Sequence, residues 1–372
     1  MRPKKSYLRI VKQNETMGIN VTTQELLEIL DLTPATQNIM LVGRHGIGKS
    51  EILTQYFKEK GMKVVPLFLG QMSDPGDLIG LPSKAEDKTT FLPPYWFPLD
   101  GKPIVLFLDE LNRARPEVLQ TIMDLALNRT LAGRQLPEGS RIISAVNSGD
   151  EYQLTDLDPA LVSRFNVYNF LPTVAEWLLW AERNKIDYRI INFIQEESVW
   201  LDGNEGQKKG IDTGLEKSPD RRAWKRVSDT ICGMDELGDL HRKLICGIIG
   251  VAATSKFFGS ISGNKILSAI DVLLHFEDSK KVLAKYRLHQ LAIVNDSIFR
   301  FLETGDILDS QVSTIGESLV GYITFLEQSK NQEALAHLAS NFEKRDYQRA
   351  ILFILDHASV VYDKIMSFIS NL

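Results

Sequence analysis

Features that would mark a secreted, membrane or zinc-binding protein are scarce in this sequence. Only two of its 372 residues are cysteines, Cys232 and Cys246, and nothing around them has the spacing of a metal site. No disulfide framework is therefore implied, and a reducing compartment fits best. No stretch approaches the roughly 20 apolar residues that a membrane helix needs. We expect the longest apolar run, LICGIIGVAA, to be a buried helix.

The chain also lacks an evident signal peptide and a strong net charge. Its basic start, MRPKKSYLRI, leads into the polar stretch VKQNETMG rather than an apolar core. We therefore expect a soluble, cytoplasmic protein that does not associate with membranes. The formal net charge of −5 gives no bulk electrostatic reason to bind nucleic acid, although a local basic patch is not excluded.

Short apolar runs alternate with helical patterns from about residue 20 to residue 171. The apolar runs read as strands, and they are NIMLVG, KVVPLFLG, PIVLFLDE and RIISAVNS. Between them lie the helical patterns TTQELLEILDL, SEILTQYFKEKG and RPEVLQTIMDLALN. Such runs, separated by helices, predict a parallel sheet covered on both faces. Residues 1–171 are thus expected to form an α/β core of three αβα layers.

Strand-like runs disappear after Pro172, and helical periodicity continues to the end of the chain. We divide this part into a helical lid, residues 172–264, and a C-terminal helical domain of unknown role, residues 265–372. The segment DGNEGQKKGIDTGLEKSPD is rich in glycine and charge, and it is expected to be a mobile loop.

A phosphate-binding loop of the form G-x-x-x-x-G-K-[ST] lies between a predicted strand and a predicted helix. Its glycines let backbone N–H groups surround phosphates, and the following helix adds the positive end of its dipole. Lys49 can reach the β- and γ-phosphates, and Ser50 can ligate Mg²⁺. The residues assigned to nucleotide contacts are Gly43, Arg44, His45, Gly46, Ile47, Gly48, Lys49, Ser50 and Glu51.

An acidic pair, Asp109 and Glu110, ends the apolar run that begins at Ile104. The carboxyl end of a buried parallel strand would deliver Asp109 beside the phosphates, where it would hold Mg²⁺. Glu110 would orient the attacking water, because phosphoryl transfer depends chiefly on positioning and charge neutralisation. Seen alone, such a pair is often only a helix cap.

Three further positions have both a functional and an ordinary interpretation. Asn147 ends the strand RIISAVN, where its amide could contact the γ-phosphate or the water, or it could simply form a turn. Arg164 could be catalytic or an ordinary surface arginine. Arg221 and Arg222 begin a helix, where the dipole disfavours positive charge, so a phosphate contact is plausible for one of them.

Taken together, these motifs resemble the MoxR branch of the AAA+ ATPases, related to the dynein-like and magnesium-chelatase-like members. The successive blocks are QMSDPGDLIGLP, FLPPYWFPLDGKPIVLFLDELNRARPEVLQTIMDL, RTLAGRQLPEGSRIISAVN and LDPALVSRF. EWLLWAE, RRAWKRVSD and GIIGVAATSKF are similar to the lid region of the family. The resemblance covers roughly residues 20 to 262.

The resemblance implies a role for each remaining position. Asn147 matches the first sensor, and Arg164 matches the arginine finger that acts on ATP bound by a neighbouring subunit. The second sensor falls in RRAW; we favour Arg222 and keep Arg221 as the alternate, because Asp220 stands where the family usually has a proline. His45 replaces a proline common in the loop.

Two family insertions are also implied, near residues 77–98 and 129–139. They are candidate surfaces for gripping a substrate, or their aromatic residues pack beneath the insertion as a small core. The aromatic residues are Phe91, Tyr95, Trp96 and Phe97.

The function implied is that of a ring-forming, hexameric ATPase that uses ATP and Mg²⁺ to remodel a protein client. The family commonly acts with a von Willebrand factor A-domain partner. A nucleic-acid motor is the first alternative, for which Arg129, Arg134 and Arg141 are the local hint. The second is a non-hydrolysing assembly switch, against which the intact Glu110 and Arg164 speak.

Overall fold

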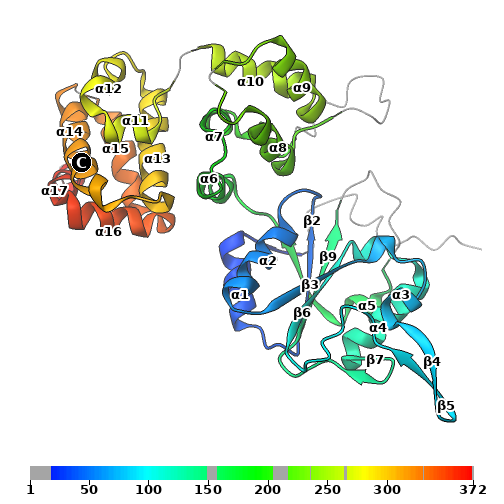
Figure 1. Ribbon diagram of the computed structural model, residues 1–372. Helices are drawn as coiled ribbons and strands as arrows, with labels where there is room; N and C mark the ends of the chain where they lie inside the picture. Colours follow the sequence, from blue (N-terminus) through cyan, green and yellow to red (C-terminus); the bar gives the residue numbers. More distant parts are fainter. Residues whose placement is uncertain are drawn as a thin grey trace, which may run out of the picture. The chain divides into compact units, whose positions relative to one another are not determined.

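The computed structural model describes residues 18–148, 157–203, 217–234, 236–263, 266–329 and 331–370 (Figure 1). The chain divides into two compact units, Met1–Thr173 and Val174–Leu372. Most of the segment expected to be a mobile loop lies outside the described residues, as does the basic start of the chain.

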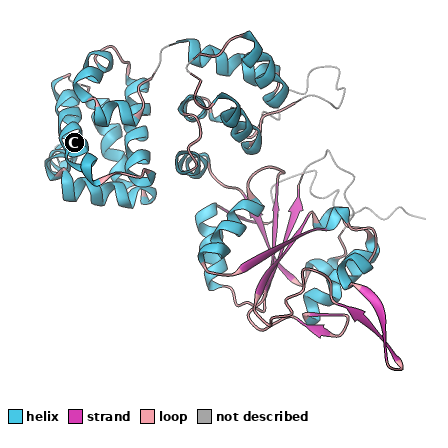
Figure 2. Ribbon diagram, in the orientation of Figure 1, coloured by secondary structure: helices cyan, strands magenta, loops and turns pink. Residues whose placement is uncertain are grey.

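A six-stranded parallel sheet forms the centre of the first unit (Figure 2). Its strand order is β1-β10-β2-β9-β6-β3. In that order the strands span Ile19–Val21, Phe165–Phe170, Asn38–Gly43, Arg141–Asn147, Ile104–Asp109 and Lys63–Phe68. All neighbouring pairs are parallel. The predicted parallel sheet is therefore confirmed.

Helices cover both faces of this sheet. Thr22 caps α1 (Thr23–Leu32) in a capping box with Glu25. With α2 (Lys49–Glu59), α1 packs on the face that carries Val105 and Phe107 of β6. The other face is covered by α4 (Pro116–Asn128). Because helices cover both faces of the sheet at β6, the sequence of this strand is an unbroken apolar run.

Small hairpins occupy both segments where the resemblance implied insertions. After the short α3 (Gly76–Ile79), β4 (Leu81–Ala85) pairs with β5 (Lys88–Leu92). Between α4 and β9, β7 (Thr130–Leu131) pairs with β8 (Arg134–Gln135). Of the aromatic residues, Trp96 is buried in the core, whereas Tyr95 is 89% exposed.

The second unit begins with five helices that share one apolar cluster. They are α6 (Val174–Arg183), α7 (Tyr188–Glu196), α8 (Arg221–Ile231), α9 (Asp239–Ile249) and α10 (Val251–Gly263). The prediction of one buried helix for LICGIIGVAA is wrong. Gly250, at φ +84°, separates α9 from α10, and Val251 beyond it is 71% exposed. Because a residue with positive φ cannot continue an α-helix, the apolar run divides at this glycine.

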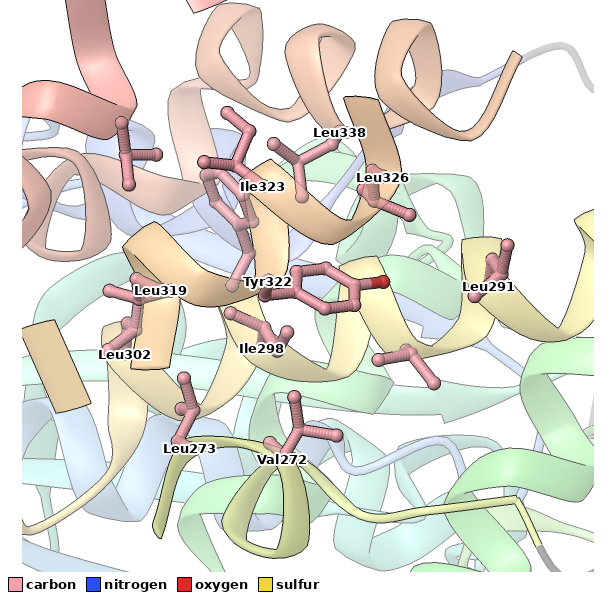
Figure 3. Close-up of a cluster of buried hydrophobic side chains, with 14 of the residues drawn as sticks. Val272, Leu273, Leu291, Ile298, Leu302, Leu319, Tyr322, Ile323, Leu326 and Leu338 are labelled. Carbon is pink, nitrogen blue, oxygen red and sulfur yellow. The ribbon is translucent and has the colours of Figure 1, made fainter. Parts of the chain in front are cut away.

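Seven more helices form a C-terminal bundle with a core of its own. They are α11 (Ala269–Leu274), α12 (Phe276–Leu283), α13 (Leu288–Thr304), α14 (Val312–Gln328), α15 (Gln332–Ser340), α16 (Gln348–His357) and α17 (Ser359–Ser370). Tyr322 lies at the centre of this core, among Val272, Ile298 and Leu319 (Figure 3). Within the described ranges, no helix is long and apolar enough to cross a membrane.

Candidate functional site

The glycine-rich loop joins the end of β2 at Gly43 to the start of α2 at Lys49. Gly46 and Gly48 have left-handed φ values of 78° and 97°, which favour glycine. A Cβ on Gly43 would lie 2.7 Å from Ile47 Cδ1 and 3.0 Å from a backbone oxygen of β10. Three glycines of the motif are thus required by the backbone. The loop leads directly into the amino end of an eleven-residue helix, which favours bound anions.

Lys49 is only 5% exposed, and its ammonium group is used within the protein. Its Nζ donates to the carbonyl oxygens of Gly43 at 2.8 Å and Arg44 at 2.9 Å. It also donates to Asn147 Oδ1 at 2.9 Å. Since an ammonium group has three protons, these contacts use its full donor capacity. A phosphate would have to replace some of them.

The remaining residues assigned to the nucleotide lie on the loop or in the first turn of α2. Ile47 packs into the core beneath the loop, whereas His45 and Glu51 are exposed. The proline-to-histidine difference at His45 therefore faces away from the packed interior.

Ser50 and Asp109 lie close enough to share a cation. Ser50 Oγ donates to Asp109 Oδ2 at 3.2 Å. Asp109 Oδ1 accepts from the backbone N–H of Glu110 at 3.0 Å. A hydroxyl and a carboxylate are the hard oxygen ligands that Mg²⁺ prefers alongside water and phosphate. No cluster of three or more His, Cys, Asp or Glu residues suited to a metal occurs in the described part of the chain. The pair therefore fits Mg²⁺ held partly by a nucleotide.

Glu110 follows Asp109 in a left-handed conformation, with φ 56°. That geometry turns its side chain back over the short 3₁₀ turn Leu111–Arg113. Its Oε1 accepts from Arg113 Nη1 at 2.8 Å, and from Asn147 Nδ2 at the long limit of 3.5 Å. The carboxylate is thus held by an ion pair in this structure. Sequence reasoning missed Arg113, because its contact depends on that left-handed turn.

Asn112 is a second site residue that sequence reasoning missed. It is 3% exposed, and its Nδ2 donates to the backbone oxygen of Asn147 at 2.9 Å. Its Oδ1 accepts from the backbone N–H of Asn147 at 3.4 Å. In the sequence Asn112 stands between Leu111 and Arg113, which gives no signal of its buried position. Asn112 fixes the backbone of Asn147.

Arg164 is not brought to this site. It directly precedes β10, whose first residue, Phe165, pairs with Asn38 at the start of β2. The phosphate loop follows the other end of β2, about 16 Å away at 3.3 Å per residue. The Arg164 guanidinium donates to the carbonyl oxygen of Ala160, and its Nε has no hydrogen-bond partner among the described residues. Arg164 therefore belongs to the opposite edge of the sheet.

The two arginines at the start of α8 have different environments. Arg221 is 8% exposed, and its Nε and Nη2 each contact the carboxylate of Asp202 at 2.9 Å. Arg222 is exposed. Asp220, which departs from the family pattern, is the N-cap of α8 and accepts from the N–H of Ala223 at 2.6 Å. Arg221 thus has a structural role, and Arg222 remains accessible.

Comparison with known families agrees with this geometry. Residues 38–165 match the family model of the AAA domain, dynein-related subfamily. This part of the chain is such an AAA domain. The matched range contains Lys49, Asp109, Glu110, Asn147 and Arg164. AAA+ domains bind nucleotide, and the family consists generally of ATPases.

Individual relatives are more distant. The chain is 28% identical over 151 residues to BssE of Thauera aromatica, which is named as a chaperone. That match covers 37% of this chain and 52% of the relative, so the chain spans about half of its length.

Among solved structures, this chain matches the RuvB Holliday junction branch migration motor of Thermotoga maritima. It is 15% identical, with a TM-score of 0.34 over 73% of this chain and 79% of that one. The Hsp104:casein complex of S. cerevisiae is 14% identical, with a TM-score of 0.34 over 61% and 44%. Likenesses at this level do not bear on function.

Proposed function

We propose that this chain is an ATP-hydrolysing member of the MoxR branch of the AAA+ ATPases. One observation carries the proposal: five polar side chains of an AAA domain meet where the parallel strands end. Lys49 contacts Asn147, Asn147 contacts Glu110, and Ser50 contacts Asp109. This collection of a cation, an amide, a hydroxyl and two carboxylates suits phosphoryl transfer to water.

Each residue then has a distinct task. Lys49 exchanges carbonyl contacts for phosphate oxygens. Ser50 and Asp109 would hold Mg²⁺, which when bound neutralises charge on the transferred phosphoryl group. Glu110 orients the attacking water, and Asn147 positions it against the γ-phosphate. Arg222, as the accessible member of its pair, is the proposed second sensor.

The position of Arg164 supports a ring. An arginine at the opposite edge of the sheet cannot contact phosphates bound by its own loop, but a head-to-tail neighbour can present it to them. A repeated head-to-tail contact generates a ring when its rotation closes, and we propose a closed, hexameric ring. An arginine finger supplied by a neighbour contributes about 10³–10⁵ in rate, so an isolated subunit should hydrolyse ATP poorly.

We further propose that the ring remodels a protein client, together with a von Willebrand factor A-domain partner. The similarity to a relative named as a chaperone supports the client. The β4–β5 hairpin and the segment after it also expose Leu81, Leu92 and Tyr95, which suit contact with an unfolded segment. The A-domain partner rests on the family resemblance alone.

The arginines that hinted at nucleic acid are largely engaged within the fold. Arg129 donates to the backbone oxygen of Ser140 and to Asn38 Oδ1. Arg134 donates to the backbone oxygen of Phe91. Guanidinium groups with such partners contribute less to phosphate binding, so a protein client is favoured over a nucleic-acid track.

ATPase rate measured against protein concentration tests the ring. The rate per subunit should rise as the subunits assemble. Glu110→Gln and Arg164→Ala should each abolish most of it, and the exposed Arg115→Ala serves as control. Analytical sedimentation shows whether each variant still assembles.

Mixing the two inactive variants makes the test sharper. An Arg164→Ala subunit keeps Glu110, and a Glu110→Gln neighbour keeps Arg164. In an equimolar, randomly mixed ring, about one quarter of the sites have both groups, so about a quarter of the wild-type rate should return. If mixing restores nothing in rings that do assemble, Arg164 does not act across subunits.

A further inference from the structure

Helix α13 buries several polar side chains, where apolar ones would be expected. Asn295 is 0% exposed, Arg300 2% and Glu303 7%. Figure 3 shows the neighbouring apolar core, built around Tyr322 and Ile298. Buried charges persist only where partners compensate for lost water. The partners of Arg300 therefore identify elements against which α13 packs.

Two of those partners come from α7 and α6, outside the bundle, while Tyr347, inside the bundle, also lies beside the Arg300 guanidinium. Gln195 of α7 donates through Nε2 to Asp296 Oδ2 at 2.9 Å, and its Oε1 accepts from Arg300 Nη2 at 2.8 Å. Glu182 of α6 lies 3.8 Å from Arg300 Nε. Leu179 of α6 packs against the apolar cluster of the bundle. We call Glu182, Gln195, Asp296 and Arg300 the Arg300 junction.

The same helix extends these contacts into the bundle. Asp296 Oδ1 also accepts from Asn341 Nδ2 at 3.1 Å, just after α15. One turn beyond Arg300, Glu303 Oε2 accepts from the backbone N–H groups of Arg349 at 2.8 Å and Ala350 at 3.1 Å, at the start of α16. One face of α13 thus connects α6 and α7 to α15 and α16.

The junction is specific in its geometry. A glutamine amide has an acceptor and a donor end, and here each faces the matching group: the oxygen faces Arg300 and the nitrogen faces Asp296. Reversing the amide would set donors against donors. Removing one partner of a buried ionic group leaves the other uncompensated. A single arrangement of α6, α7 and α13 is therefore strongly preferred.

We propose that the Arg300 junction makes α6–α10, the proposed lid, and the α11–α17 bundle one rigid body. The bundle then moves together with the lid, and it acts as a lever arm that transmits the movements driven by ATP hydrolysis to a client or partner. The first statement holds without nucleotide; the second rests on the proposed function.

A distance measurement by pulsed electron spin resonance tests the rigid body. One spin label is placed on the exposed Cys232 at the end of α8, with Cys246→Ser to remove the second thiol. The other is placed on Gln348→Cys, an exposed position at the start of α16. The full chain should give one narrow distance distribution. A broad distribution would overturn the rigid body.

Variants show whether the junction is the cause. Gln195→Ala removes both amide contacts from the lid side without entering the bundle core, and it should widen the distribution at least twofold. Gln332→Ala, an exposed glutamine of α15, should leave it unchanged. Arg300→Met is the stronger change, used only if circular dichroism shows that it folds. If Gln195→Ala leaves the distribution narrow, the junction does not fix the arrangement.

Adding Mg²⁺ and the slowly hydrolysed analogue ATPγS tests the second statement. The distance between the labels should stay the same, since lid and bundle move together. A changed distance would mean that the bundle does not follow the lid. A fluorescent ATP analogue is titrated in parallel. If it does not bind, the proposed function fails and the arm role falls with it, whereas the nucleotide-free comparison of variants still decides the rigid body.

Discussion

Replacing Asn112 by alanine should destabilise the first unit far more than an ordinary surface change. The Asn112 amide is buried and satisfies both the C=O and the N–H of Asn147. Alanine would leave these two backbone groups without their partner at the end of β9. No other side chain is altered, so the effect reports on this one contact.

The magnitude follows from the two contacts. The 2.9 Å bond is of ordinary strength, and the 3.4 Å bond is weak. A lost hydrogen bond costs about 1 kcal/mol, and a buried group left unsatisfied costs about 1–3 kcal/mol. Counting the strong contact fully and the weak one partly, we expect the free energy of unfolding to fall by about 2–3 kcal/mol.

Hydrogen-exchange mass spectrometry of peptides from β6 and β9 measures this loss locally, which suits a chain of two units. Asn128→Ala is the matched control, because that exposed amide also donates one hydrogen bond, to Asp124 at 2.6 Å. It should cost less than about 0.5 kcal/mol. If Asn112→Ala cost no more than its control, Asn112 would not fix Asn147, and the reasoning would be wrong.

Further changes test other contacts. Arg113→Met frees the carboxylate of Glu110 from its ion pair and should raise basal ATPase kcat up to about fivefold. The control Arg115→Met should leave kcat unchanged, and a lower kcat in Arg113→Met would contradict this. Gly250→Ala places a Cβ 2.2 Å from a carbonyl oxygen and should cost more than about 1 kcal/mol by thermal unfolding, whereas the unobstructed helical Gly247→Ala should stabilise. Burial raises the pKa of Glu182 despite a nearby guanidinium. The folded state then holds that proton more tightly, so stability should fall as pH rises from about 4.5 through the raised pKa, and less so in Glu182→Gln.

The central strands were predictable because a strand buried on both faces has an unbroken run of apolar residues in its sequence. β6 is buried from Ile104 to Leu108, and every residue in that stretch is apolar. The two strands at one side of the sheet, β1 and β10, have no such apolar run. β10 reads FNVYNF and has only its two ends buried, so alternating polar residues conceal it. β1 is three residues long, too short for any periodicity.

Only the site residues whose positions follow from the ends of the parallel strands were predictable from the sequence. Residues that end parallel strands meet at one edge, so the sequence alone places Asp109 and Asn147 beside the loop. The ion pair of Glu110 with Arg113 depends instead on one left-handed residue. No pattern in the surrounding sequence specifies that conformation, because non-glycine residues adopt it only where tertiary contacts require it.

The contacts of Lys49 explain why Asn112 should also matter for turnover. If phosphate binds as proposed, Lys49 must exchange some of its three protein oxygens for phosphate oxygens, and one of these is Asn147 Oδ1. Because Asn112 fixes the backbone of Asn147, the released amide can respond only by turning its side chain. The carboxylate of Glu110 lies within reach of that amide, at 3.5 Å from Asn147 Nδ2. Phosphate binding in the loop would thus change the contact between Asn147 and Glu110 through rotation of one side-chain amide. A mobile backbone at residue 147 would weaken this coupling without removing any group that contacts ATP.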